Sequence, residues 1–212
     1  MQYLSYNKKT IVDISDTSVE SEYNRGFVMT RVGKGVMNET SSLRINLSNF
    51  DLTSENRRIL RKTENLALSK VQLPIEIDDY DWKIHKIGKD FYTEKFGDST
   101  FSANKIKEIV TTDHNFSSLF VYTRDDEIIG YCVAVETSSM LHYCYPFYRL
   151  DVDTNNLGMG MMLKAILYAV DKEKDYVYLG SVQRETDKYK LQFKGLELWN
   201  HEKGMWEAIE NK

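Results

Sequence analysis

The sequence predicts an α/β protein in which a mixed, mostly antiparallel sheet is flanked by helices. Three stretches carry this prediction. Residues 143–180 are patterned as strand, glycine loop, helix and strand, residues 119–136 as a β-hairpin, and residues 82–110 as two helices. A helical crossover makes its two strands parallel, whereas a hairpin makes them antiparallel. A sheet built from both units is therefore mixed.

The strand–loop–helix–strand unit holds the most informative residues. Residues 143–150 are rich in β-forming side chains, and apolar residues recur at helical spacing between Leu163 and Val170. Gly158 and Gly160 lie between these two segments. A glycine loop leading into a helix offers unpaired backbone N–H groups and a favourable dipole to an anion. The pair therefore predicts an anion-binding loop, with a simple tight turn as the alternative.

Composition bounds the functional class. Of 212 residues, 42% are apolar and 28% are charged, and the formal net charge is −4. This length fits one large or two small domains. No apolar run approaches the roughly 20 residues that span a bilayer, and the first residues carry no hydrophobic signal region. We therefore expect a cytoplasmic protein without membrane or DNA partners, in which any nucleic-acid contact comes from a local basic patch.

Cysteine and histidine give no sign of a metal or disulfide framework. The two cysteines, Cys132 and Cys144, are too few for a disulfide scaffold, so we expect free, buried thiols. The four histidines show no metal-ligand spacing. No serine–histidine–aspartate arrangement, P-loop or dinucleotide fingerprint is present.

The first half of the chain contains weaker signals. Residues 1–22 show no clear period, whereas residues 26–37 predict two short strands around a glycine turn, and residues 43–47 predict another strand. A Thr-Ser pair can cap a helix over residues 53–71. Residues 72–81, with a proline and several acids, predict a linker.

The helix expected from residue 53 carries a basic face. Arg57, Arg58 and Arg61 fall opposite its apolar side, together with Lys62. Arginine offers a planar fork of donors that suits phosphate. The face therefore predicts phosphate contact, with a solvated helix surface as the alternative.

Three side chains are candidates for proton chemistry. Glu136 ends a long apolar strand, where a carboxylate can orient or deprotonate an attacking amine. The alternative is a surface acid at a strand end. Tyr145 and Tyr148 can form an aromatic wall or donate a phenolic proton, with core packing as the alternative.

In kind and order, these motifs resemble the tRNA-dependent N-terminal protein aminoacyltransferases, the arginyl- and leucyl-transferases of the N-degron pathway. The resemblance runs from QYLSYN at Gln2 and NRGFVMTR at Asn24, through SLRINLSNFDLTSENRRILRKTENL at Ser42, to LFVYTRDDEIIGYCVAVE, YPFY and NNLG. The pentapeptide YVYLG, which ends at Gly180, is its most specific match. KLQFKG at Lys190 is similar to a lysine-bearing element of the family. The resemblance covers nearly the whole chain.

This resemblance implies a GNAT-type acyltransferase fold with a smaller, GNAT-related N-terminal module. We place the module at residues 1–75 and the catalytic domain at residues 76–212. The implied reaction moves an aminoacyl group from charged tRNA to the N-terminal amine of a protein or peptide. The ester is already activated, so the enzyme supplies positioning, a proton route and oxyanion stabilisation, and requires no cofactor or metal.

The resemblance and the local patterns together assign roles to residues. The expected catalytic residues are Glu136, Tyr145 and Tyr148, and the expected tRNA-binding residues are Arg57, Arg58 and Arg61. The expected substrate-binding residues are Tyr178, Gly180, Gln183, Lys190 and Lys194. The expected acyl-donor loop consists of Asn155, Leu157, Gly158, Met159 and Gly160.

Departures from the family pattern keep other functions open. The family's N-terminal cysteine cluster is missing, and Ser181, Val182 and Gln183 replace an aromatic pair and an isoleucine. Asn155 stands where the family has Arg or Gln. The G-x-G loop is closer to the pyrophosphate loop of acyl-CoA-using GNAT enzymes. An N-acyltransferase that uses acetyl-CoA is therefore the main alternative, and a non-catalytic module that binds protein N-termini is a third.

Overall fold

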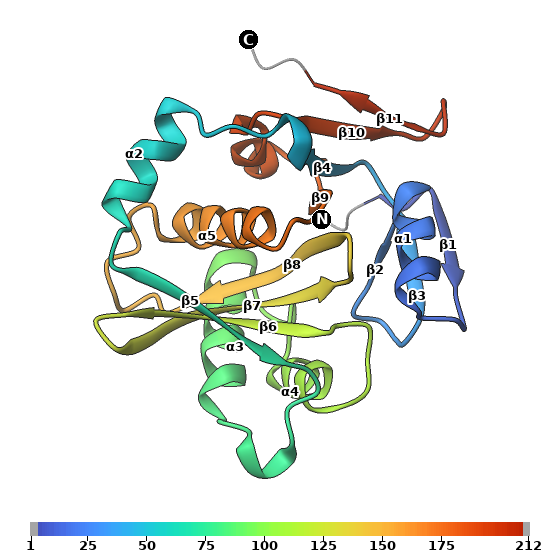
Figure 1. Ribbon diagram of the computed structural model, residues 1–212. Helices are drawn as coiled ribbons and strands as arrows, with labels where there is room; N and C mark the ends of the chain where they lie inside the picture. The colour runs from blue at the N-terminus through green and yellow to red at the C-terminus, as the bar shows by residue number, and fades with distance from the viewer. Residues whose placement is uncertain (1–3, 210–212) are drawn as a thin grey trace.

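The chain is organised around one eight-stranded sheet, which the computed structural model describes within residues 4–209 (Figure 1). The strand order is β11-β10-β4-β9-β8-β7-β6-β5, and a second sheet has the order β1-β3-β2. The outer limits of the two predicted domains, and Gln2 of the first motif, lie outside the described residues.

The elements have the following bounds. The large sheet consists of β4 (Ser42–Asn46), β5 (Leu66–Gln72), β6 (Ser118–Arg124), β7 (Glu127–Glu136), β8 (Met140–Tyr148), β9 (Tyr176–Ser181), β10 (Leu196–Asn200) and β11 (Met205–Ala208). The small sheet consists of β1 (Asn7–Thr10), β2 (Phe27–Met29) and β3 (Val36–Glu39). The helices are α1 (Asp16–Asn24), α2 (Ser54–Lys62), α3 (Lys83–Phe96), α4 (Ala103–Thr111) and α5 (Leu157–Asp171), with 3-10 turns η1 (Leu47–Asn49), η2 (Ile77–Asp79) and η3 (Glu185–Gln192).

Helices cover both faces of the large sheet (Figure 1). Helices α3 and α4 pack on one face, while α5 packs on the other and α2 packs against α5. The apolar core is accordingly divided into two clusters. One contains Leu163 and Ile166 of α5, and the other contains Ile106 of α4. The predicted class, a mixed and mostly antiparallel sheet flanked by helices, is confirmed.

One predicted helix is correct only in its first half. Thr53 caps α2 by accepting from the Asn56 N–H at 3.1 Å, but the helix ends at Lys62 and residues Leu66–Gln72 form β5. Strand β5 pairs with β6 along its whole length. That ladder satisfies backbone groups of both strands, so tertiary pairing overrides the local helical pattern.

The other predicted elements are present, and the polar N-terminus holds two more. The hairpin β6–β7, strand β8, the crossover helix α5 and strand β9 lie where the sequence places them. Strand β1 and helix α1 were not predicted, because only Val19 and Tyr23 of α1 are buried. Strands β4 and β5 of the first 75 residues belong to the large sheet. The domain boundary at residue 75 stays a prediction.

The centre of the large sheet contains a fork between β8 and β9. These strands pair in parallel only where Met140–His142 face Tyr176–Tyr178. Strand β9 stays paired with β4 as far as Ser181, and a bulge in β8 interrupts its register with β7 at Cys144. We define the fork as the diverging segments 143–148 of β8 and 179–181 of β9.

Gly160 allows α5 to approach the end of α2. A Cβ added there would lie 2.7 Å from both Oγ1 and Cγ2 of Thr63. Thr63 is buried, and its hydroxyl donates to the Ile59 carbonyl at 2.9 Å, so it cannot rotate away at no cost.

We predict that Gly160→Ala destabilises the protein even though alanine favours helices by about 1 kcal/mol. Overpacking of this kind costs about 1–3 kcal/mol, so after the helix gain is subtracted the free energy of unfolding in urea should fall by up to about 2 kcal/mol. Gly33→Ala is the control, because its Cβ would meet only Val36, at 3.6 Å. A Gly160→Ala variant more stable than the parent would contradict the packing.

Candidate active site

Two nitrogen donors converge beside the backbone of β9. Gly180 has a φ of 73° and no side chain. The position of a Cβ there lies 3.7 Å from Nε2 of His142 and 4.0 Å from Nζ of Lys190. Two nitrogen groups therefore lie near the same stretch of β9, where the absence of a side chain at Gly180 leaves room beside them.

His142 is a neutral imidazole with a fixed orientation. The Tyr23 hydroxyl accepts the Met29 N–H at 3.1 Å and forms a hydrogen bond with His142 Nδ1 at 2.8 Å. Burial, reinforced by the charge of Lys190, lowers the pKa of His142 to about 3. In the tautomer in which Tyr23 donates to Nδ1, the imidazole proton is on Nε2, for which the described residues provide no acceptor.

Lys190 is a buried lysine at the edge of the fork. Its Nζ donates to the Ser181 carbonyl at 2.9 Å. Burial lowers its pKa to about 8, although the nearby carboxylate of Asp187 opposes this shift. Asp187 accepts the N–H groups of Gln183 at 3.1 Å and Arg184 at 3.0 Å. These bonds fix the loop between β9 and η3, and thereby the position of Lys190.

The N-terminus of α5 lies at the other side of the fork. Asn156 precedes the helix with a φ of 61°. A Cβ at Gly158 would lie 3.3 Å from Cε1 of Tyr148 and 3.5 Å from its hydroxyl. The phenol thus borders the first turn of α5, and burial raises its pKa. Tyr148 remains protonated at neutral pH and can act as a proton donor.

The glycine loop has fewer open donors than the sequence pattern suggests. The Leu157 N–H donates to the Thr154 carbonyl at 3.0 Å, and the Gly160 N–H donates to the Asn156 carbonyl at 2.8 Å. Within the described residues, the N–H groups of Gly158 and Met159 have no acceptor. The anion-binding capacity of the loop therefore rests on these two groups, while Gly160 serves helix packing.

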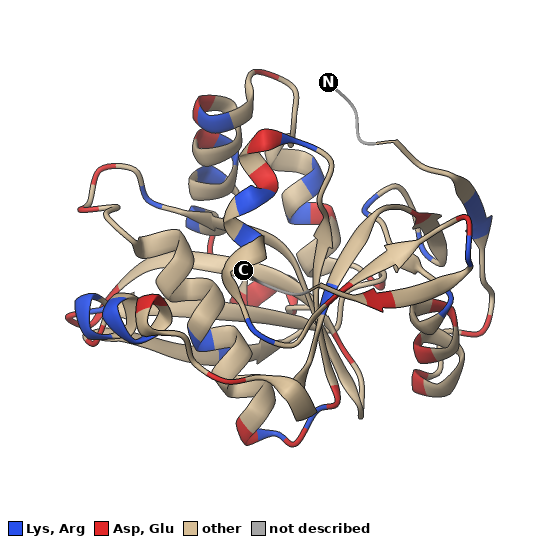
Figure 2. Ribbon diagram, turned by 90° about the horizontal axis from the view of Figure 1, so that it is seen from above, with Lys and Arg blue, Asp and Glu red and all other residues tan. Residues whose placement is uncertain are grey.

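The basic helix lies beside this loop. Arg58 pairs with Glu55 and also donates to the Asn156 side chain at 3.3 Å. Arg57 and Arg61 are exposed and form no ion pair among residues 4–209. Figure 2 shows basic positions along α2. The structure therefore brings one predicted tRNA-binding residue, Arg58, into contact with Asn156 in the predicted donor loop.

Three of the predicted site residues point elsewhere. Tyr145 packs between Phe101 and Phe116, with ring centroids 5.3 and 5.5 Å away, on the α4 face of the sheet. Tyr178 is buried and accepts from Arg44 at 3.2 Å. Lys194 is exposed and pairs with Asp51. Their proposed catalytic and binding roles stay predictions, and the present site does not use them.

Glu136 lies at the far end of the β7–β8 hairpin. Its carboxylate is 3.0 Å from Lys70 Nζ, the Ser118 hydroxyl and the Tyr168 hydroxyl, and Lys174 Nζ lies 3.4 Å away. Burial would raise its pKa, but the hydrogen bonds from these partners hold the pKa below the usual value. A carboxylate held in this way is a weak base.

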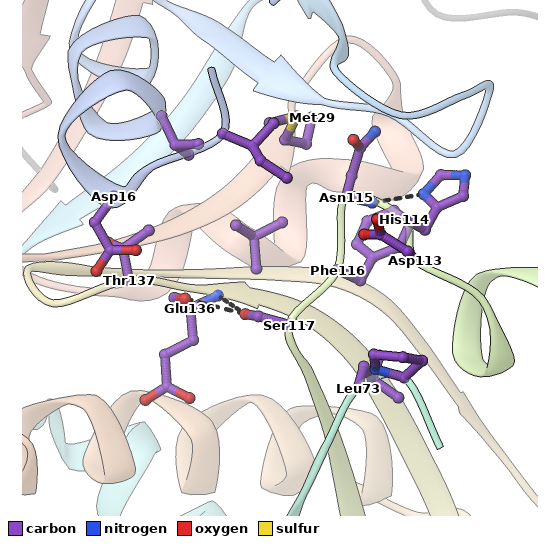
Figure 3. A pocket seen from close by; sticks show the side chains of 14 residues that line it. Asp16, Met29, Leu73, Asp113, His114, Asn115, Phe116, Ser117, Glu136 and Thr137 are labelled. Atoms are coloured by element: carbon purple, nitrogen blue, oxygen red, sulfur yellow. Dashed lines mark hydrogen bonds between the residues drawn. The ribbon is translucent and has the colours of Figure 1, made fainter. Parts of the chain in front are cut away.

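Figure 3 shows where the Glu136 side chain points. Glu136 lines a pocket of about 210 Å³ between α1 and the start of β6. Its carboxylate points away from this pocket, toward α5. Its partner Tyr168 is ten residues along α5 from Gly158, about 15 Å at 1.5 Å per residue. The structure does not bring Glu136 together with the fork, so its catalytic role stays an untested prediction.

Sequence reasoning missed several residues of the fork. It weighed His142 only as a metal ligand, and no pattern in the sequence marked this residue as part of the site. Asp187 escaped notice, because an acid in an irregular segment gives no local pattern.

Within the described residues, no helix has the length and apolar character to cross a membrane. The same residues contain no cluster of three or more His, Cys, Asp or Glu suited to a metal ion. Cys132 and Cys144 are free thiols, as expected, and burial raises the pKa of both.

The fold is similar to that of two solved structures. One is a C-terminal domain from Agrobacterium fabrum whose description names a lysylphosphatidylglycerol synthetase, with 11% identity, a TM-score of 0.50, and coverage of 77% of this chain and 61% of that one. The other is L-PGS from Bacillus licheniformis, with 10% identity, a TM-score of 0.50, and coverage of 85% and 63%. The chain thus spans less than two thirds of either structure. No curated protein matches it.

The fold defines the class as a mixed α/β protein whose large sheet is flanked by helices. The family model described as arginine-tRNA-protein transferase, C terminus, matches residues 78–200. The chain belongs to this family, and the family predicted from the sequence is confirmed.

We predict that Glu136→Gln lowers stability by about 1–2 kcal/mol, because Lys70 and Lys174 lose their shared counter-charge. The folded-state pKa of Glu136 is depressed, so its contribution is present above the ordinary pKa of 4.5 and is lost as the pH falls through the folded value. Urea unfolding at several pH values measures the difference in the free energy of unfolding between the parent and Glu136→Gln. A difference between parent and variant that does not shrink in acid would contradict the assignment.

We predict that Lys190 titrates near pH 8, far below ordinary lysines. Reductive ¹³C-dimethylation followed by NMR should reveal one lysine resonance with this midpoint, absent from Lys190→Arg. The amine is charged below pH 8 and neutral above it, because burial disfavours its charged form. Lys194→Arg is the matched control, since Lys194 is exposed. Titration of every lysine near pH 10 would contradict burial of this amine.

Proposed function

We propose that this protein transfers an aminoacyl group from charged tRNA to the N-terminal amine of a protein or peptide. The observation that carries the proposal is the contact between Arg58 and Asn156, which joins the basic helix α2 to the start of α5. Family membership supports the same reaction. The exposed Arg57 and Arg61 would contact phosphates of the tRNA, while the aminoacyl ester would enter the fork.

The reaction forms one bond and breaks one. The neutral acceptor amine attacks the ester carbonyl, and the carbonyl oxygen becomes an oxyanion. Nε2–H of His142 and the charged Nζ of Lys190, which both lie near Gly180, would stabilise that oxyanion. The new C–N bond remains and the C–O bond to the terminal ribose breaks. The leaving ribose oxygen takes up a proton from a donor in the site, and the proton lost by the amine restores that donor. Tyr148 is suited to relay that proton.

A second donor is supported by the loop itself. The unpaired N–H groups of Gly158 and Met159 at a helix N-terminus suit a pyrophosphate, as in acyl-CoA-dependent transfer. Because Gly160 is committed to packing against Thr63, only part of the G-x-G loop is available for this purpose. We therefore rank acetyl-CoA below charged tRNA as the donor.

A transfer assay separates these donors. Purified protein receives either charged tRNA or acetyl-CoA, together with peptides that differ in their first residue, and products are read by mass spectrometry. A tRNA-dependent gain of one amino acid supports the proposal and names the donor. An acetyl gain reassigns the protein to the acyl-CoA enzymes.

We predict that Arg57→Ala/Arg61→Ala weakens tRNA binding and flattens its salt dependence. Removing one arginine–phosphate interaction reduces the slope of log K against log salt by about 0.7–0.9. Filter binding across a salt series gives both quantities. The control variant Lys83→Ala/Lys89→Ala removes equal charge from α3, on the other side of the sheet. It should change neither the tRNA affinity nor its salt slope strongly. Equal behaviour of the two variants would place the tRNA elsewhere.

A further inference from the structure

The side chain of Gln183 holds a peptide backbone at the edge of the fork. Its Oε1 accepts the Leu4 N–H at 2.6 Å, and its Nε2 donates to the Leu4 carbonyl at 2.9 Å. One amide side chain thus makes both hydrogen bonds that a neighbouring strand would make to that residue. The Leu4 residue is 60% exposed, so Gln183 binds its backbone and not its side chain.

The held segment continues along a defined surface. The Tyr6 hydroxyl lies 2.8 Å from the Ser41 hydroxyl, and its ring stacks on His201 with centroids 4.3 Å apart. The Tyr6 N–H donates to the Glu39 carbonyl at 2.9 Å. We call the surface formed by Gln183, Ser41 and His201 the peptide ledge.

The peptide ledge is directly connected to the fork. Lys190 donates to the carbonyl of Ser181, two residues before Gln183, and Asp187 fixes the Gln183 backbone. A peptide that replaced residues 4–6 on the ledge would run past the same loop that positions Lys190. Backbone hydrogen bonds do not depend on sequence, so the contact that Gln183 makes with Leu4 could also be made with the backbone of another peptide.

We propose that the peptide ledge is the binding track for the acceptor peptide, and that the segment Leu4–Tyr6 of this chain occupies it as an internal competitor. This inference rests on the proposed function, because it names how the acceptor of that reaction is recognised. Release of the internal segment should expose the ledge, and loss of the Gln183 amide should remove its main contact.

The test measures peptide binding without any donor. The probe is a pool of eight-residue peptides with a free, varied N-terminal residue and a C-terminal fluorophore, followed by anisotropy. Leu4→Pro/Tyr6→Ala removes the Leu4 N–H and the stacked ring, and we expect at least threefold tighter binding. Adding Gln183→Ala to that variant should weaken binding about tenfold, since two hydrogen bonds are removed. Gln72→Ala, on the far edge strand, is the matched control and should change nothing.

A second measurement keeps the test independent of folding defects. A free peptide with the sequence of residues 4–9, LSYNKK, should displace the probe from the Leu4→Pro/Tyr6→Ala variant. It should also displace the probe when Gln72→Ala is added to that variant. Unchanged affinity on release, or equal binding with and without Gln183, would overturn the inference, as would failure of every variant to bind peptide. If binding follows the expected order while charged tRNA yields no product, the ledge stands and the proposed reaction fails.

Discussion

The separation of β8 from β9 is the constraint on which the site depends. Strand β9 stays paired with β4 as far as Ser181, with one register shift between Tyr178 and Gly180, while its parallel pairing with β8 stops at Tyr178. The backbone groups beyond that point need other partners, and one of them, the Ser181 carbonyl, receives the buried amine of Lys190. Breaking the ladder therefore both opens the sheet and recruits a charged group to its interior.

The charges around the fork are arranged so that burial works in favour of function. A buried lysine costs free energy in its charged form, and the protein meets part of that cost with the Ser181 carbonyl and the carboxylate of Asp187. His142 is kept neutral by the same burial. One donor is thus charged near neutral pH and the other is not. A developing oxyanion would gain from both, without two adjacent positive charges repelling each other.

The sequence predicted elements well where a single period extended over many residues. The unit from β8 through α5 to β9 has strong patterns, and the structure follows them. The second half of the helix expected over residues 53–71 failed because Leu66–Gln72 gains a full ladder with β6, which no local pattern reveals. The same limit applies to the site. Glu136 looked like a free acid at a strand end, and only the fold shows two lysines reaching it, Lys70 from β5 and Lys174 from beyond the end of α5.

The two glycines of the donor loop illustrate why a motif alone cannot assign a role. In the sequence they form one G-x-G pair with one predicted purpose. In the fold, Gly160 makes room for Thr63 and so supports the packing of α5 against the end of α2. Gly158 makes room for Tyr148 and so borders the fork. The packing of Gly160 against Thr63 therefore separates the roles of two residues that the sequence pattern treats as one motif.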